Sequence, residues 1–408
     1  AVNLGEFWAV DQIGGVAHIF NQADLNDPTV DAVASEVSVV SPGANSVRMH
    51  ILGFSNHAGI DPASRTIYTY LNGWMGIWAT NGGTGSPTHI EDLEASTVNI
   101  YNEEGLGAPD KGNTSHACGG NPQNDQIQCA SIFNGDFTLF EADMTTDTYT
   151  RIGVYRTGDL PISDKLKGKL KKDVEAAYGD MLAIDSNPNN ICSQYDTSGD
   201  LLYIAAQTSA NTGGIIVVDV SDPSNPAILD AYSDVMAAGC GLVNNPDGEH
   251  LWITHGFNKQ GDPEEISIWA YANAGKRNGP VDRVALPTDD SQEVYGGDAH
   301  GAQYAGITSS FFWQTMRVDD TMQILSNAGG DGEIVNEIDL RAATGRSVVS
   351  PDVLDRSQLG AHMYYTTRGQ IPTSAIGSYR NKNRASGVDV FATVFGYDGV
   401  FVKHEDMS

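Results

Sequence analysis

Four histidines recur at comparable places along the chain and are its best candidates for chemistry. They are His57, His116, His300 and His362, each at the start of a segment that reads as a turn and a strand. Neutral imidazole binds copper and zinc well, and the Irving–Williams order favours copper. If these segments converge, we expect the four histidines to hold one metal centre, with copper ahead of zinc. A histidine at a strand start also serves as a hydrogen-bonded structural residue, and that alternative stays open.

Four cysteines, Cys118, Cys129, Cys192 and Cys240, lack the spacing of a zinc or haem motif. Two disulfides are the simplest account, one within the local loop 118–129 and one between Cys192 and Cys240, which hold matching places in successive repeats. Disulfides persist in oxidising compartments, so we expect an extracellular or periplasmic protein. The chain begins at Ala1 without an apolar leader, which we interpret as a signal peptide already removed.

The elements that must position these residues read as repeated short strands. Residues 196–229 give a turn, an apolar strand, a Gly-containing turn, a second strand and an Asp-Pro break. Similar segments have reference residues at His57, His116, Cys192, Cys240, His300 and His362, separated by 59, 76, 48, 60 and 62 residues. That spacing fits one four-stranded blade with its loops. We expect an all-β chain, a single β-propeller domain over 1–408 with about seven four-stranded blades, the seventh joining both chain ends.

Two segments resemble known propeller repeats. IIVVDVSDPSNP, at 215–226, resembles the LVIVD repeat, and the Asn-Pro-Asp-Gly turn within 240–256 resembles YVTN-type repeats. The histidine placement is similar to that of copper-binding propellers, namely nitrous oxide reductase and the thiocyanate dehydrogenase fold. That resemblance implies imidazoles from successive blades around copper at the axis. Paired His-His starts are missing here, so one or two metal ions suit four histidines better than a cluster.

Tyr364 and Arg368 are the candidate catalytic residues. They follow His362 on its expected strand, where alternation sends either Tyr364 or Tyr365 toward the channel. A channel tyrosine suits proton or radical chemistry, but an aromatic side chain packed between blades is the favoured interpretation. Asp298, two residues before His300, could orient the imidazole.

Two acidic turns, 24–31 and 329–333, contain oxygen donors for calcium. Neither has EF-hand spacing, so ordinary turns are favoured. The motifs of α/β-hydrolases, Walker-loop nucleotide binders and zincins are missing from the sequence.

One segment interrupts the strand pattern. Residues 163–184 have helix formers at helical spacing, which predicts a short helical insertion outside the ring. The segment carries Lys165, Lys167, Lys169, Lys171 and Lys172. This concentration of positive charge could dock an acidic partner, and a solvated surface helix is the plainer interpretation.

The chain has 23 Lys and Arg against 52 Asp and Glu, a net charge of −29. Such charge repels phosphate backbones and anionic lipid surfaces, so we expect no nucleic-acid partner. No stretch has the apolar length of a membrane span, so we expect no membrane insertion.

Three functions remain. The first is a secreted metalloprotein, a copper-dependent oxidoreductase acting on a small molecule. The second is a polysaccharide lyase that uses His57, His116, Tyr364 and Arg368 on a uronate, although a charge of −29 argues against a basic groove. The third is a propeller without catalysis that binds a protein or self-associates, in one version by joining the lysine segment to an acidic face of the next copy.

Overall fold

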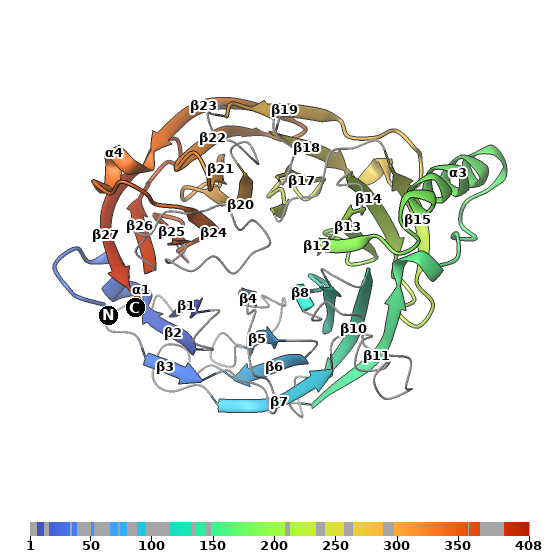
Figure 1. Ribbon diagram of the computed structural model, residues 1–408, viewed down its shortest axis with the longest axis horizontal. Helices are drawn as coiled ribbons and strands as arrows, with labels where there is room; N and C mark the ends of the chain where they lie inside the picture. The colour runs from blue at the N-terminus through green and yellow to red at the C-terminus, as the bar shows by residue number, and fades with distance from the viewer. Residues whose placement is uncertain are drawn as a thin grey trace.

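Small antiparallel sheets stand in a ring around one axis (Figure 1). The computed structural model describes residues 6–11, 16–32, 35–38, 50–52, 66–71, 74–79, 88–94, 115–131, 135–143, 148–208, 213–233, 241–256, 264–288, 298–357, 359–367 and 387–407. Within them, six sheets have four strands and one has three. The expected single all-β propeller is confirmed, but seven four-stranded blades are not: six are four-stranded.

Each sheet is a meander of strands consecutive in sequence. The three-stranded sheet contains β1 (Glu6–Asp11), β2 (Val16–Asn21) and β3 (Ser35–Ser38). The first three blades are β4 (His50–Leu52), β5 (Thr66–Leu71), β6 (Trp74–Ala79), β7 (Thr88–Glu94); β8 (Ser115–Gly120), β9 (Gln126–Ser131), β10 (Asp136–Asp143), β11 (Thr148–Arg156); and β12 (Asn189–Tyr195), β13 (Leu201–Gln207), β14 (Gly213–Asp219), β15 (Ala227–Tyr232).

The last three blades follow the same plan. They are β16 (Leu242–Asn244), β17 (His250–His255), β18 (Glu264–Ala270), β19 (Asp282–Leu286); β20 (Ala299–Ala305), β21 (Phe311–Met316), β22 (Thr321–Ala328), β23 (Asp331–Asp339); and β24 (Pro351–Arg356), β25 (His362–Thr367), β26 (Gly387–Ala392), β27 (Val400–Asp406). The helices are α1 (Gln22–Asn26), α3 (Gly168–Ile184) and α4 (Leu340–Thr344).

The β12–β15 blade shows how sequence sets a blade. The turn after β12 is closed by Asp196, whose carboxylate accepts from the Ser198 hydroxyl and the Leu201 amide, and Gly199 supplies the positive φ of 74°. All seven residues of β14 are buried. A strand covered on both faces reads as a continuous apolar run rather than an alternation, which accounts for GGIIVVD.

Strand direction defines two ends of every blade. Neighbouring strands are antiparallel, so the first and third strands of a blade run the same way. The innermost strands begin at what we call the entry end, where the second strand also passes to the third. Turns from the first to the second strand and from the third to the fourth lie at the opposite, exit end.

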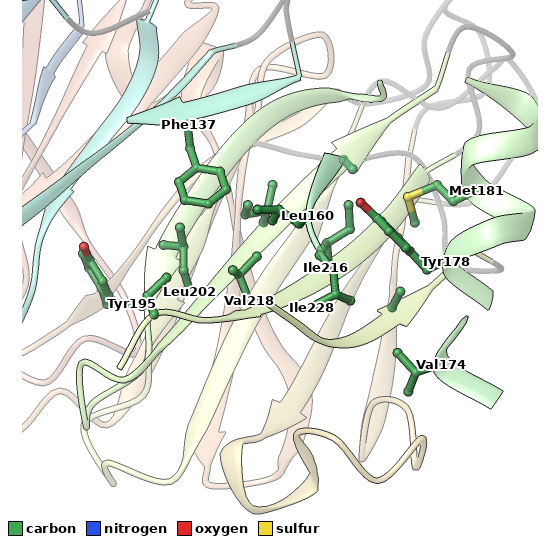
Figure 2. Close-up of a cluster of buried hydrophobic side chains, with 14 of the residues drawn as sticks. Phe137, Leu160, Val174, Tyr178, Met181, Tyr195, Leu202, Ile216, Val218 and Ile228 are labelled. Atoms are coloured by element: carbon green, nitrogen blue, oxygen red, sulfur yellow. The ribbon is translucent and has the colours of Figure 1, made fainter. Parts of the chain in front are cut away.

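Helix α3 lies outside the ring and packs against β15, as Figure 2 shows for its buried face. Val174, Tyr178 and Met181 are buried in one cluster with Phe137 of β10 and Ile216 of β14. The Tyr178 hydroxyl donates to the Thr157 carbonyl, which fastens the helix to the preceding link. The predicted helical insertion at 163–184 is therefore confirmed, starting at Gly168.

The three-stranded sheet and the last blade are in contact but remain separate sheets. In the described residues β27 pairs with β26, whereas β1 pairs with β2, which contradicts the expected joint blade. Side chains close the ring instead: the Phe7 and Tyr364 rings lie 4.8 Å apart, and Lys403 Nζ donates to the Asp24 and Val30 carbonyls at 2.7 and 2.8 Å. The strand β27 completes the last blade, which leaves no pairing position for β1 there.

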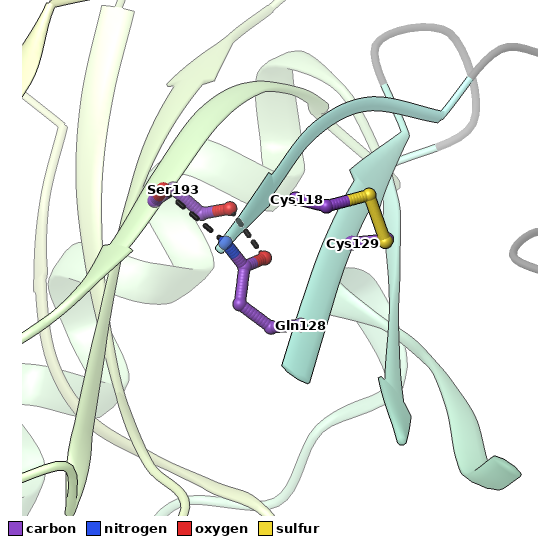
Figure 3. Close-up of a disulfide and its surroundings, with 4 residues drawn as sticks. All are labelled: Cys118, Gln128, Cys129 and Ser193. Carbon is purple, nitrogen blue, oxygen red and sulfur yellow. Dashed lines mark hydrogen bonds between the residues drawn. A yellow bond between two sulfur atoms is a disulfide. The ribbon is translucent and has the colours of Figure 1, made fainter. Parts of the chain in front are cut away.

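A disulfide joins the first two strands of the β8–β11 blade (Figure 3). Cys118 and Cys129 lie opposite each other in the β8–β9 register and are bonded, as predicted. Beside them, Gln128 Nε2 donates to the Ser193 carbonyl at 3.3 Å and its Oε1 accepts from the Ser193 hydroxyl at 2.6 Å, linking this blade to the next. Among the described residues, no helix is long and apolar enough to cross a membrane.

We expect Cys118→Ala together with Cys129→Ala to lower the free energy of unfolding by about 2–3 kcal/mol, because the bond closes a short loop in the unfolded chain. Urea denaturation with and without dithiothreitol measures this. Reductant should destabilise the parent chain more than the double variant. Equal stability of oxidised parent and double variant would contradict the prediction.

Candidate functional site

The innermost strands β20 and β24 begin alike at the entry end. Asp298 and Ser350, which directly precede these strands, have positive φ values of 53° and 51°. In both strands the register shifts over the two residues after the first, so His300 and Asp352 occupy matching positions on neighbouring inner strands. The bulges turn both side chains toward a common interior point.

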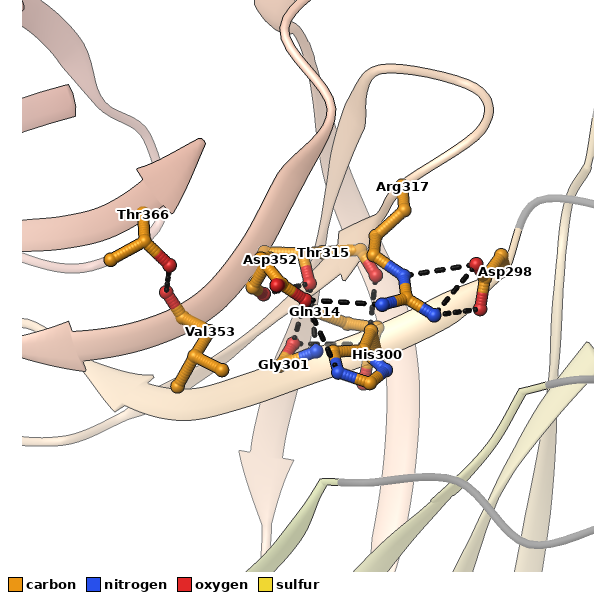
Figure 4. Close-up of polar contacts among 9 residues, drawn as sticks. All are labelled: Asp298, His300, Gly301, Gln314, Thr315, Arg317, Asp352, Val353 and Thr366. Atoms are coloured by element: carbon orange, nitrogen blue, oxygen red, sulfur yellow. Dashed lines mark hydrogen bonds and ion pairs between the residues drawn. The ribbon is translucent and has the colours of Figure 1, made fainter. Parts of the chain in front are cut away.

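Four charged or ionisable side chains meet there, which we call the inner-strand ion network: Asp298, His300, Arg317 and Asp352 (Figure 4). Arg317 Nε and Nη2 each donate to a different oxygen of Asp298 at 2.9 Å, and Nη1 donates to Asp352 Oδ1 at 3.2 Å. His300 Nε2 lies 3.2 Å from that same Asp352 oxygen. The Arg317 side chain has no solvent exposure.

Close approach of β20 to β24 depends on Gly301. A Cβ there would lie 2.3 Å from the Asp352 carbonyl oxygen, so any other residue would push the strands apart. The Thr315 hydroxyl accepts from the Gly301 amide at 2.8 Å and reaches the Asp352 carbonyl at 2.9 Å. These contacts fix the distance across which Arg317 binds both carboxylates.

Glu264 ties a third blade to the same point. From the start of β18, its two carboxylate oxygens accept the backbone amides of Asp298 and Ala299 at 2.5 and 2.6 Å. Burial and the neighbouring Asp298 charge raise the pKa of Glu264 to about 8, although the two amides favour the ionised form. Glu264 therefore holds the start of β20 in place.

This arrangement favours a structural brace over a reactive centre. All four members of the inner-strand ion network are buried. The Arg317 guanidinium forms a bidentate pair with Asp298 and a further bond to Asp352, so the charges of the network bind one another. Asp298 therefore binds Arg317 rather than orienting His300, and Asp352, which sequence did not single out, contacts the imidazole.

The surroundings of His300 do not fit the copper site implied by the resemblance. His300 shares Asp352 with the Arg317 guanidinium, and that cation opposes a metal ion at the same place. Where side chains are described, no group of three His, Cys, Asp or Glu is placed to hold a metal.

The four histidines do not share one position. His116 falls in the corresponding bulge of the inner strand β8, so its place matches that of His300. His362 instead begins β25, a second strand, at the exit end, and its expected equivalence is wrong. Burial lowers the pKa of His362. His57 and the side chain of His116 lie outside the described residues, so their metal role stays a prediction.

Tyr364 does not face the channel. It is fully buried against Phe7, and its hydroxyl donates to Asn26 Oδ1 at 2.8 Å. Tyr365 is also fully buried, in the cluster between its blade and the β20–β23 blade. Both faces of β25 are covered by neighbouring sheets, so alternation points neither ring at the axis. Arg368 lies outside the described residues.

The structure describes part of the remaining predicted sites, which are the second disulfide and the two candidate calcium turns. Cys192 is buried on β12, while Cys240 lies outside the described residues, so their disulfide stays a prediction. In the turn at 329–333, the Gly329 carbonyl accepts from Asn245 Nδ2 at 3.1 Å. In the turn at 24–31, the candidate calcium turn, the ammonium of Lys403 donates to the Asp24 and Val30 carbonyls.

The lysine segment, Lys165–Lys172, is a second candidate site. It leads into and forms the first turn of α3, on the outer side of the ring (Figure 1). The Lys165 and Lys169 side chains are 61% and 88% exposed. Lys165 pairs with Asp219 at 2.6 Å, Lys169 with Asp173 at 2.5 Å and Lys171 with Asp164 at 3.2 Å. The pairs of Lys169 and Lys171 are solvent-exposed and contribute little, whereas Lys165 binds the buried carboxylate of Asp219.

Sequence reasoning missed the centre of the ion network. Asp352 and Glu264 belong to no motif, and only the fold brings them beside Arg317. One usable signal is Thr-x-Arg at the end of a second strand, at 315–317 and again at 366–368.

We expect Arg317→Met to lower the free energy of unfolding by about 3–5 kcal/mol, because it leaves two buried carboxylates without their cation. The matched control is Arg283→Met, which removes a partly exposed pair with Glu265 and should cost under about 1 kcal/mol. Urea denaturation of both variants provides the comparison. Similar losses would show that the network is not a brace.

Stability should fall as pH rises from about 4.5 to about 8, because the folded chain holds the Glu264 proton more tightly than the unfolded chain does. Glu264→Gln should flatten this slope. The substitution also places a side-chain amide opposite two backbone amide donors, but the resulting loss of stability is the same at every pH. The control is Glu265→Gln, the next residue along. Chemical denaturation at several pH values measures the slopes, and an unchanged slope in Glu264→Gln would refute the assignment.

Comparison with known proteins supports the fold. A family model for the LVIVD repeat matches residues 196–234, a small part of the chain. The chain matches no curated protein. Similar solved structures include the periplasmic gluconolactonase of Pseudomonas aeruginosa, with 13% identity over 88% of this chain and 83% of that one and a TM-score of 0.54.

Kuenenia stuttgartiensis hydrazine synthase shares 12% identity over 96% and 93% of the two chains, with a TM-score of 0.58. A Lactobacillus plantarum protein shares 9% identity over 98% and 95%, with a TM-score of 0.59. At these identities the likeness shows the β-propeller fold alone. What is established is a β-propeller with one LVIVD-matching repeat.

Proposed function

We propose that this chain is an extracellular or periplasmic binding propeller that docks an acidic protein partner through the lysine segment. The observation that carries the proposal is the charge distribution. Five of the ten lysines fall between residues 165 and 172 in a chain of net charge −29. A local basic site on an acidic protein selects a partner by charge and orients it on approach.

The fold presents this segment for contact. The apolar face of α3, with Val174, Tyr178 and Met181, packs against the blades, so the lysines lie on the solvent side. The overall negative charge does not prevent docking, because salt screens charges beyond about 8 Å at physiological ionic strength. Only the local surface then counts.

The interior chemistry supports binding rather than catalysis. His300 and Tyr364 are buried in contacts between sheets, and His362 is partly buried. The disulfide supports the proposed compartment, since such bonds persist under oxidising conditions.

We expect the full chain to bind poly-L-glutamate, used as an acidic polypeptide probe, and Lys169→Glu with Lys172→Glu to weaken this about tenfold. The control, Lys276→Glu with Arg341→Glu, makes the same change in net charge elsewhere. Isothermal titration calorimetry at about 0.05 M and about 0.5 M salt tests both, and salt should weaken parent binding. Absent parent binding, or equal loss in both variants, would overturn the proposal.

A further inference from the structure

Exposed apolar side chains gather at the exit end of two neighbouring blades. The described residues include eleven exposed large hydrophobics, and six of them form what we call the turn patch. Its members are Ile307, Leu359, Val394, Phe395, Tyr397 and Val400. Phe395 is 71% exposed and Val400 70%. Single exposed apolar residues are ordinary, but six together mark a contact surface.

Backbone contacts hold these turns side by side. The Ile307 amide donates to the Val394 carbonyl at 3.1 Å, which joins the β20–β21 turn to the β26–β27 turn. The Trp313 indole donates to the Gly396 carbonyl at 2.6 Å. Gly396 has a φ of 85°, and a Cβ there would lie 2.5 Å from the Ala305 carbonyl oxygen. The patch is therefore built into the packing of the two blades and needs no ordering on contact.

The turn patch is nearly free of charge. Within the described parts of the turns 306–310, 357–361 and 393–399, Asp398 is the charged residue, and the Arg356 guanidinium at the end of β24 donates to the Ser309 hydroxyl beside them. Thr308 and Ser310 add exposed hydroxyls at its rim. In a chain where 18% of residues are charged and the net charge is −29, such a face is distinct from the rest of the surface.

We propose that the turn patch is the contact face of a homodimer, occupied by the same patch of a second copy of this chain. Six side chains of these sizes and exposures present on the order of 600 Å² of surface. A stable interface buries about 800 Å² per partner, which the polar rim brings within reach. In a two-fold contact the patch of one copy covers the patch of the other, so neither copy keeps its patch exposed.

Charge supports a second copy as the occupant. Two chains of net charge −29 repel one another over most approaches, and the face with the least charge is where they meet at lowest cost. Salt screens that repulsion, so dimerisation strengthens as salt rises. Docking through the lysine segment has the opposite dependence, and the turn patch lies on different blades from α3.

Sedimentation velocity on the full chain tests the dimer at about 0.05 M and about 0.5 M salt. We expect a dimer fraction that grows with salt and with concentration into the tens of micromolar. Phe395→Glu places a carboxylate on each side of the contact and should give a monomer. Val281→Glu, at a 44% exposed valine outside the patch, should dimerise like the parent.

A second variant separates loss of contact from loss of fold. Ile307→Ser with Leu359→Ser removes apolar surface without changing charge and should weaken the dimer at least about tenfold, with thermal unfolding of the monomer unchanged. Lys169→Glu with Lys172→Glu should dimerise normally, so failure of docking and failure of dimerisation are distinguishable. A monomeric parent at high salt, or equal behaviour of Phe395→Glu and Val281→Glu, would overturn the proposal.

Discussion

Face-to-face packing of neighbouring sheets is the constraint on which the rest of this structure depends. From β12 to β27 the described blades pack on both faces, so their middle strands are largely apolar, as in the fully buried β14. The clusters between blades contain Trp252, Trp313 and Phe137, all fully buried. Burial of such large side chains supplies most of the driving force for closing the ring.

The same packing decides what polar groups can do near the axis. Inner-strand side chains that face a neighbouring blade leave water, and a charge there must find a partner. Arg317 is tolerated because two carboxylates bind it. Glu264, at the start of β18, is tolerated because its pKa is raised to about 8 and two backbone amides donate to it. Groups that look reactive in the sequence thus become cross-braces between three blades.

Function then falls to surfaces that packing does not use. The helical insertion packs its apolar face against the ring and exposes lysines, while the exit-end turns of the last two blades expose an apolar patch. These two surfaces differ in chemistry and lie on different elements. A propeller that assembles with itself at one and binds an acidic partner at the other uses the scaffold without a channel reaction.

The sequence by itself determined the propeller, the helical insertion and the Cys118–Cys129 bond, because turn residues, apolar runs and helical spacing are local signals. It misplaced His362 by one strand, since a repeat start and a second-strand start look alike when blades vary in loop length. It offered Tyr364 or Tyr365 as a channel residue because alternation assumes one open face, whereas both faces of β25 are covered. Only the tertiary structure decided that Asp298, Arg317, Asp352 and Glu264 converge, because contacts between blades join residues far apart in the chain and no local pattern records them.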